Sequence, residues 1–206
     1  WDVYEVFFRL SLVPEHRLNA ANWLTPFLLD SALTNRDAYL SHAAFESFDS
    51  NGAVRSLLNA ALLADVKRWP KESLRLASIA LAWLTSCADR RVRDLSSKAL
   101  ARIISIQPNL GRALTDEFRE CDDDYILESV SLAIYSACLL EPERMEEFLP
   151  AFEGLLSPAF DIPNILVRDS VRLFGQLLMN AGHGAGLAKQ FEVYPGKASL
   201  PKKWPT

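Results

Sequence analysis

Apolar residues recur at intervals of three and four along most of this 206-residue chain, and no segment shows a sustained alternation of apolar and polar residues. This spacing places apolar side chains on one face of an α-helix, whereas a half-buried strand needs a period of two. The pattern therefore predicts an all-α fold. The predicted helices cover residues 2–12, 20–29, 35–46, 53–66, 71–87, 91–106, 110–120, 124–139, 143–156 and 164–180.

Polar residues and prolines mark several of the predicted helix starts. The side chains of Thr34 and Asp89 can accept hydrogen bonds from the free N–H groups of a first turn. Pro26 is expected to kink the second helix or to restart it after Thr25. Four other prolines fit a first-turn position, where no donor is missed: Pro70, Pro108, Pro142 and Pro163. Short connections predict about five antiparallel helix pairs.

A short unit recurs in the helices expected to be second in their pairs. The unit is a Val-Arg pair followed by small or apolar residues one and two turns later. It appears as Val54-Arg55 with Leu58 and Ala61, Val92-Arg93 with Ser96 and Ala99, and Val167-Arg168 with Val171 and Phe174. Ile126 and Leu127 take the place of the pair in a further unit, where Glu128 stands opposite Asp94 and Asp169. From Arg55, the steps are 38, 34 and 41 residues.

Steps near 40 residues with one helix pair each are typical of stacked two-helix arrays, because a lone hairpin cannot bury its apolar face. The pattern resembles HEAT repeats, whose second helix carries D-x-x-V-R-x-x-A-x-x-A-L. Residues 89–100 match it at Asp89, Val92, Arg93, Ala99 and Leu100, with Ser96 in place of the first small apolar residue. We therefore expect an α-solenoid of about five HEAT-like pairs over residues 1–182, followed by an irregular exit segment or linker over 183–206.

Residues 89–100 can be assigned individual roles. Asp89 should cap its helix, and an apolar stripe should face the partner helix, formed by Val92, Leu95, Ala99, Ile103 and Ile106. Arg93 lies one residue round from the stripe and can pair with an acidic group of the next layer, such as Glu128. A ligand-facing Arg93 is the alternative.

The candidate residues for partner binding or inter-repeat contacts come from these units and from one tryptophan. They are Arg55, Arg90, Arg91, Arg93, Asp94, Arg168, Asp169 and Trp69. Tryptophan is a favoured interface anchor. Trp69 precedes Pro70 and could meet a neighbour, whereas Trp83 lies in an apolar helix and is expected in the core.

Charge bears on the class of partner. The chain carries 22 Lys and Arg against 26 Asp and Glu, a formal net charge of −4, whereas domains that hold phosphates by charge are usually basic. This balance argues against nucleic acid. An open alternative is an arginine-lined face of the kind that HEAT-like alkylpurine DNA glycosylases use, for which the candidates are Arg90, Arg91, Arg93, Arg102 and Arg112.

Cysteine usage and the lack of long apolar runs bear on the compartment. Cys87, Cys121 and Cys138 show no CxxC spacing and are expected to be reduced thiols. No apolar run approaches the roughly 18 to 20 residues of a membrane span, and no signal-peptide pattern opens the chain. We expect a cytoplasmic protein without membrane contact. The start at Trp1 and the Pro- and Lys-containing end are expected of a segment cut from a longer protein.

Motifs for catalysis or cofactor binding are not recognisable. The glycine-rich residues 181–189, "AGHGAGLAK", lack P-loop spacing and follow a helix instead of a strand. The histidines His16, His42 and His183 are scattered. The acidic run at residues 120–124, "ECDDD", lacks EF-hand spacing, and its aspartates are expected to cap the helix that follows. The sequence predicts no catalytic residue, metal site or cofactor within this chain.

Four segments together resemble a narrower family. They are "HRLNAANWLTPFLL" (16–29), "TNRDAYLSHAAF" (34–45), "ALAWLTSCADRRVRDLSSKALARII" (80–104) and "DDDYILESVSLAIYSA" (122–137). In this order they look like the helical-repeat region of large bacterial STAND NTPases of the antiviral type. In that family the repeats serve as ligand sensor and scaffold beside a P-loop NTPase module.

The resemblance implies that this chain is a non-catalytic segment of such an NTPase. Its partner would be a protein ligand or other domains of the same chain. A nucleic-acid-binding HEAT-like protein and a stand-alone adaptor are the alternatives.

Overall fold

The computed structural model describes residues 2–156 and 164–182, and every regular element within these ranges is helical, as the periodicity predicted. The predicted helix at 164–180 is among them, whereas Pro163 and the predicted exit segment at 183–206 lie outside the described residues. The α-helices are α1 (Asp2–Ser11), α2 (Thr25–Leu29), α3 (Leu33–Asp49), α4 (Ala53–Leu63), α5 (Lys71–Leu84), α6 (Arg90–Ile106), α7 (Asn109–Glu117), α8 (Asp124–Leu140), α9 (Leu149–Leu156) and α10 (Ile165–Asn180).

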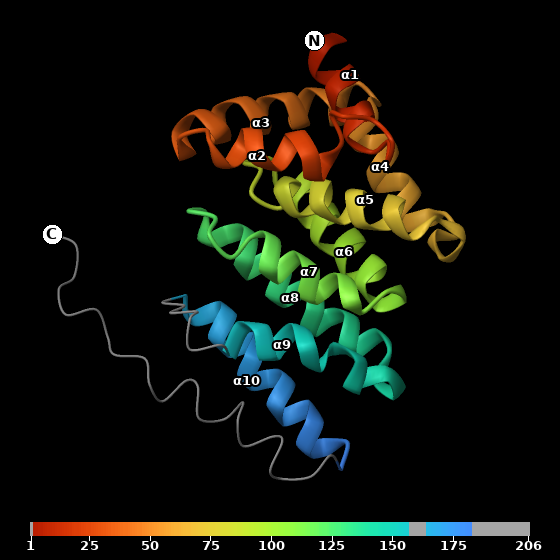
Figure 1. Cartoon of the computed structure of the whole chain (residues 1–206), viewed down its shortest axis with the longest axis vertical. Coiled ribbons are helices and arrows are strands. Elements are labelled where there is room, and N and C mark those ends of the chain that lie inside the picture. Colours follow the sequence, from red (N-terminus) through yellow and green to blue (C-terminus); the bar gives the residue numbers. More distant parts are fainter. Residues whose placement is uncertain (1, 157–163, 183–206) are drawn as a thin grey trace, which may run out of the picture.

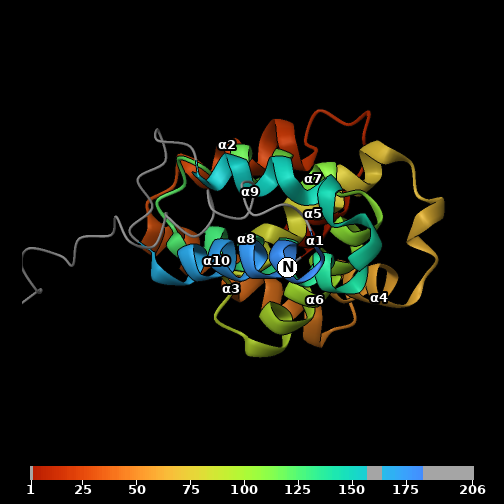
Figure 2. The same ribbon diagram turned by 90° about the horizontal axis from the view of Figure 1, so that it is seen from below.

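The helices follow one another along the long axis of the molecule, from α1 at one end to α10 at the other (Figure 1). Helix α4 packs against α6, α6 against α8, and α8 against α10. Beside this row, α5 packs against α7 and α7 against α9. Seen along the long axis, the two rows lie side by side (Figure 2). Within the pairs α5–α6, α7–α8 and α9–α10, each helix contacts the next one along the chain.

The N-terminal helices depart from the expected pairing. Helix α1 packs on α3, α4 and a π-helical turn, η1 (Ala20–Leu24), instead of forming a pair with α2. The predicted helix at 20–29 is split as Pro26 suggested, because α2 begins at Thr25 with this proline in its first turn. The predicted antiparallel pair of the first two helices is therefore not formed, so about five regular pairs was an overestimate for the described residues.

Other helix boundaries also differ from the predictions. Helix α3 begins at Leu33, so Thr34 lies inside its first turn, and the prediction that Thr34 caps it is wrong. Short 3₁₀ segments, η2 (Val66–Arg68) and η3 (Pro142–Phe148), replace the end of the helix predicted at 53–66 and the start of that predicted at 143–156.

Three helices of the row α4–α6–α8–α10, namely α6, α8 and α10, begin with a side-chain cap. Asp89 Oδ1 accepts from the backbone N–H groups of Arg91 and Val92, at 2.8 and 3.2 Å, as predicted. Asp123 caps α8 and Asn164 caps α10 in the same manner. Such caps satisfy N–H groups that the helix itself leaves free.

Helix α4 differs, because Gly52 precedes it and its cap comes from other helices. Glu5 of α1 accepts from the N–H of Ala53, and Ser47 Oγ of α3 accepts from that of Val54 at 3.0 Å. A Cβ on Gly52 would lie 2.6 Å from Glu5 Oε2 and 2.9 Å from the Ser47 carbonyl oxygen, so this close approach requires glycine.

The recurring sequence units occupy the same register in four successive helices of this row. Val54, Val92, Ile126 and Val167 are all buried in the second or third position of α4, α6, α8 and α10. The residues four and seven positions later are buried in every unit as well: Leu58 and Ala61, Ser96 and Ala99, Val130 and Ala133, Val171 and Phe174. The predicted stripe of α6 faces the core, with Leu95 and Ile106 partly buried at its ends.

Trp83 lies at the centre of the N-terminal half, as predicted. It is fully buried, its Nε1 donates to Thr25 Oγ1 at 3.0 Å, and its ring meets that of Phe118 edge-on at 5.1 Å. A buried tryptophan needs such a partner for its N–H group. Trp83 therefore joins α2, α5 and the end of α7.

Candidate functional site

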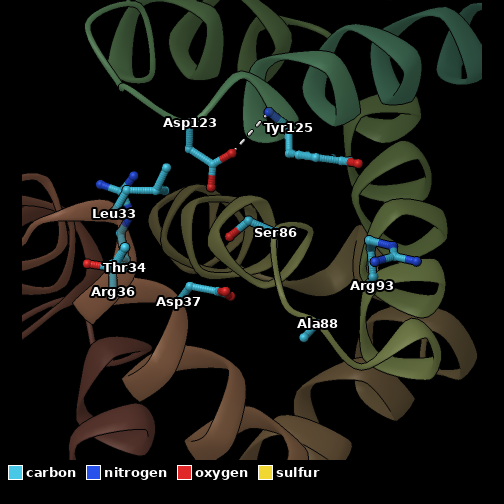
Figure 3. A pocket seen from close by; sticks show the side chains of 9 residues that line it. All are labelled: Leu33, Thr34, Arg36, Asp37, Ser86, Ala88, Arg93, Asp123 and Tyr125. Carbon is cyan, nitrogen blue, oxygen red and sulfur yellow. Dashed lines mark hydrogen bonds between the residues drawn. The ribbon is translucent and has the colours of Figure 1, made fainter. Parts of the chain in front are cut away.

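A polar pocket of about 420 Å³ opens where α3 and α8 begin and the α5–α6 loop ends (Figure 3). The lining residues are Leu33, Thr34, Arg36, Asp37, Ser86, Ala88, Arg93, Asp123 and Tyr125.

The wall formed by α3 is fixed to the α5–α6 loop by a chain of hydrogen bonds. The backbone N–H of Ala88 donates to Ser41 Oγ at 2.9 Å, and Ser41 Oγ donates to Asp37 Oδ1 at 2.8 Å. Asp37 is thereby oriented by a loop that lies about 50 residues further along the chain. In Figure 3, Asp37 and Asp123 both point toward the middle of the pocket, and Arg93 lies on the α6 wall.

Arg36 is a buried residue at the bottom of this pocket. Only 1% of its surface is exposed, its Nη1 donates to the Leu28 carbonyl at 3.2 Å, and its Nη2 donates to Asp122 Oδ1 at 2.6 Å. Its guanidinium also lies 5.5 Å from the centre of the Trp83 ring. A buried charge needs such partners, because removal from water is costly for an isolated ion. Arg36 thus ties α3 to α2, α5 and the α7–α8 loop.

The carboxyl group of Asp123 is the half-buried acid of the pocket. Burial raises its pKa, and the hydrogen bond from the Tyr125 N–H together with the nearby Arg36 opposes this rise. The pocket thus combines two carboxylates, Asp37 and Asp123, with donors on Arg93 and Tyr125. This arrangement can bind a polar or charged group by hydrogen bonds and ion pairing.

Arg93 is the predicted candidate that reaches this pocket, but the prediction of its partner is wrong. It does not pair with Glu128. Its Nη1 lies 3.5 Å from the carbonyl oxygen of Cys87, because the side chain turns back over the α5–α6 loop instead of along α8. Arg90 and Asp94 are paired with each other on the exposed side of α6, at 3.2 Å.

Arg55 and Arg91 converge on one aromatic ring at the end of α3. The guanidinium carbons of Arg55 and Arg91 lie 4.3 and 5.1 Å from the centre of the Phe48 ring. Arg91 also pairs with Asp89 at 2.9 Å and lies 3.6 Å from Asp49. Cations over an aromatic face are attracted by its quadrupole, so these two candidates hold the starts of α4 and α6 against α3.

The remaining candidates lie elsewhere. Asp169 pairs with Arg172 on α10 at 2.7 Å, and Arg168 lies half-buried on the same helix. Trp69 is partly buried beside an apolar hollow of about 470 Å³ between α1, α4 and α5. The eight predicted residues therefore do not form one site.

Arginines proposed as nucleic-acid contacts are engaged within the chain. Arg102 donates to the carbonyl groups of Ala61 and Ala64 at the end of α4, at 2.8 and 2.9 Å. Arg112 pairs with Asp116 at 2.6 Å and reaches the Pro150 carbonyl at 3.3 Å. The contacts with carbonyl groups connect α6 to the end of α4 and α7 to α9, whereas the Arg112–Asp116 pair lies within α7.

Sequence reasoning missed Arg36, Asp37 and Tyr125 as members of a pocket. A signal for Arg36 was present, because it falls on the same helical face as Leu40 and Ala44, both of which are buried. A charged residue within an apolar stripe indicates a buried ion pair. The partner, Asp122, cannot be found from spacing because it lies 86 residues away.

The three cysteines are free thiols, with Cys87 and Cys138 buried. Desolvation raises the pKa of all three, that of Cys87 to about 12. In the described part of the chain, no cluster of three or more His, Cys, Asp and Glu side chains could hold a metal ion. Across residues 2–156 and 164–182, no helix has the length and apolar character needed to cross a membrane.

Comparisons with protein-family models, with curated proteins and with solved structures gave no significant match to this chain.

Proposed function

We propose that the described residues, 2–156 and 164–182, belong to a HEAT-like α-solenoid that acts as a scaffold, binding a protein partner or other segments of its own protein. The observation that carries this proposal is the shared register of the four recurring units. Their Val or Ile residues are buried at the starts of α4, α6, α8 and α10, and each of these helices packs on the next. This is the arrangement that a stack of repeat units needs to bury a continuous core.

Arginines that join one layer to the next also favour a scaffold. Arg102 of α6 donates to the end of α4, and Arg144 of η3 donates to the Ser105 carbonyl near the end of α6, at 3.0 Å. Cations at helix C-termini are favourable because the helix dipole is negative there. Each such contact transmits a displacement of one layer to its neighbour, as ligand sensing by a repeat array requires.

The resemblance to antiviral STAND NTPases suggests the kind of larger protein in which this scaffold would act. Its strongest segment, residues 80–104, covers the end of α5 and most of α6, and the segment at 122–137 lies mainly on α8. In such a protein this chain would sense a ligand and shift the attached NTPase module.

The test is to delete residues 53–140 from the NTPase that carries this segment and to measure NTP hydrolysis with and without lysate of phage-infected cells. We expect basal hydrolysis to persist and the stimulation to be lost. Leu63→Asn, a change at an exposed residue, is the control and should leave stimulation intact. Stimulation that survives the deletion would contradict the proposal.

A further inference from the structure

Helix α8 exposes four large apolar or aromatic side chains, although it lies between α6 and α10 in the row. Tyr125, Leu132 and Leu139 are 62, 51 and 53% exposed, and Leu140 beside them is also exposed. Residues seven apart lie on the same face of a helix, so the first three form one outward stripe of about 21 Å, at 1.5 Å per residue. At the equivalent positions of the preceding unit, α6 carries Arg91 and Lys98 in place of Tyr125 and Leu132.

Leu132 and Leu139 of this stripe, together with Leu140, form one wall of a groove between α6 and α8, whereas Tyr125 lines the polar pocket described above. The groove has a volume of about 630 Å³. Its lining residues are Asp94, Ser97, Lys98 and Ala101 of α6, with Leu132, Ala133, Ser136, Leu139 and Leu140 of α8. Ala101 and Ala133 are buried, so small side chains form the floor while leucines form the α8 wall. A floor of small residues leaves room for side chains from outside.

Charges at the rim define what the groove can accept. Asp94 is compensated by Arg90, which lies 3.2 Å away on the same helix. Lys98 is exposed and forms no ion pair with any residue of the described chain. The uncompensated charge of the groove is therefore positive, and it lies on the α6 side of the groove.

We propose that this groove binds an amphipathic α-helix of a partner protein, which places apolar side chains against Leu132, Leu139 and Leu140 and a carboxylate against Lys98. Recognition of this kind uses anchors at positions i, i+3 or i+4, and i+7 of the bound helix. Leu132 and Leu139 lie about 10 Å apart along α8, at 1.5 Å per residue, which matches anchors seven residues apart. The inference rests on the proposed scaffold function and assigns the surface and the class of partner.

Two synthetic peptides test the chemistry on the intact chain. Each is a fluorescein-labelled amphipathic helix of about 18 residues with leucines at i, i+4 and i+7, long enough to span the stripe. One carries Glu and the other Lys beside the central leucine. Fluorescence anisotropy should show the Glu peptide binding about tenfold more tightly, and Lys98→Glu should reverse this preference.

Substitutions in the groove separate specific binding from general adhesion. Leu132→Asp should weaken both peptides at least about tenfold, as expected for an interface anchor. Leu63→Asp, at a residue 80% exposed on α4 and outside the groove, should change neither affinity. Circular dichroism would check that each variant remains folded. We expect it to do so, because the substituted residues are exposed.

Three results would overturn the inference. If both peptides bound equally and Lys98→Glu changed neither affinity, the proposal that the partner helix carries an acidic residue would be wrong. Binding unaffected by Leu132→Asp would place the site elsewhere. A dimer of the chain in light scattering that Leu132→Asp dissociates would assign the groove to a second copy. If the groove fails these tests while deletion of 53–140 still abolishes stimulation, the scaffold proposal survives with another surface.

Discussion

Arg36 and Asp122 form an ion pair of 2.6 Å in which the cation is buried and the anion is 62% exposed. The pair joins α3 to the α7–α8 loop beside the polar pocket. Water can solvate Asp122 when the contact opens, but it cannot reach Arg36, whose Nε already has no hydrogen-bond partner in the described structure. Loss of the contact therefore costs free energy mainly because the buried guanidinium of Arg36 is left without its charged acceptor.

Asp122→Asn should lower the free energy of unfolding by about 1–3 kcal/mol, because the buried guanidinium loses its charged acceptor. Urea unfolding followed by circular dichroism measures this change. Glu72→Gln breaks an ion pair of similar length, 2.7 Å, with Arg75, whose side chain is 36% exposed, and should cost less than about 1 kcal/mol. Equal losses in the two variants would show that the burial of Arg36 has no energetic effect.

Ser96→Ala should stabilise the fold. Ser96 stands where the HEAT signature has a small apolar residue, and its buried Oγ has no hydrogen-bond partner in the described part of the chain. Removing the hydroxyl should raise the free energy of unfolding by about 1 kcal/mol, since an unpaired buried polar group costs about 1–3 kcal/mol. The control is Ser78→Ala, because the buried Ser78 hydroxyl donates to the Leu74 carbonyl at 2.7 Å and its removal should give no gain.

Arg102→Met should destabilise the junction of α4 and α6 by about 1–3 kcal/mol, because two carbonyl groups at the end of α4 lose a charged donor. Arg90→Met is the matched change on the same helix. Arg90 forms an exposed ion pair with Asp94, so this variant should lose less than about 0.5 kcal/mol. Thermal unfolding of both variants provides the comparison, and a larger loss in Arg90→Met would contradict this assignment.

Alkaline pH should weaken the fold partly through Cys87. Burial raises the pKa of this thiol from 9.0 to about 12, so between these values the unfolded chain releases a proton that the folded chain retains. The contribution of the Cys87 thiol to the free energy of unfolding is therefore fully present below pH 9. It declines as the pH rises toward 12, by up to about 1.4 kcal/mol per pH unit for one group. Urea unfolding from pH 8 to 10.5 should show a shallower decline for Cys87→Ala than for the native chain. An identical slope would contradict the burial of this thiol.

The chain should not bind duplex DNA tightly. The arginines that could contact phosphates are paired with carboxylates or carbonyls of the chain, and the net charge is −4. Anisotropy of a labelled duplex of about 20 base pairs should show no binding below about 100 μM at physiological salt, the weak end of non-specific affinity. Salt-dependent binding in the low micromolar range would favour the nucleic-acid alternative.

Helical periodicity predicted the fold class well because it reports local physics. Val92 and Ile126 were assigned to equivalent positions, and both are buried. Each stands three residues after the aspartate that caps its helix, so a local signal sets the same register in both helices. The pocket was not predictable to the same degree. Its walls come from α3, the α5–α6 loop and α8, and spacing along the chain carries no information about which loops meet.

The error on Arg93 has a related cause. Sequence pattern placed its Cα beside the apolar stripe correctly, but the direction of a long side chain depends on nearby acceptors. Here the acceptor is the Cys87 carbonyl, six residues earlier in the chain. Arg36 was missed because its burial depends on Trp83 and Asp122, both distant in sequence.

The cap that Glu5 provides to α4 spans 48 residues, and it constrains how this protein can be shortened. A truncation that begins at residue 20 would remove no part of α4, yet it would leave the Ala53 N–H at the start of that helix without its acceptor, while Ser47 would still cap Val54. Gly52 cannot replace Glu5, since it has no side chain. Expression boundaries chosen to trim the N-terminus should therefore keep Glu5, or introduce a new acceptor ahead of α4, if the first recurring unit is to remain ordered.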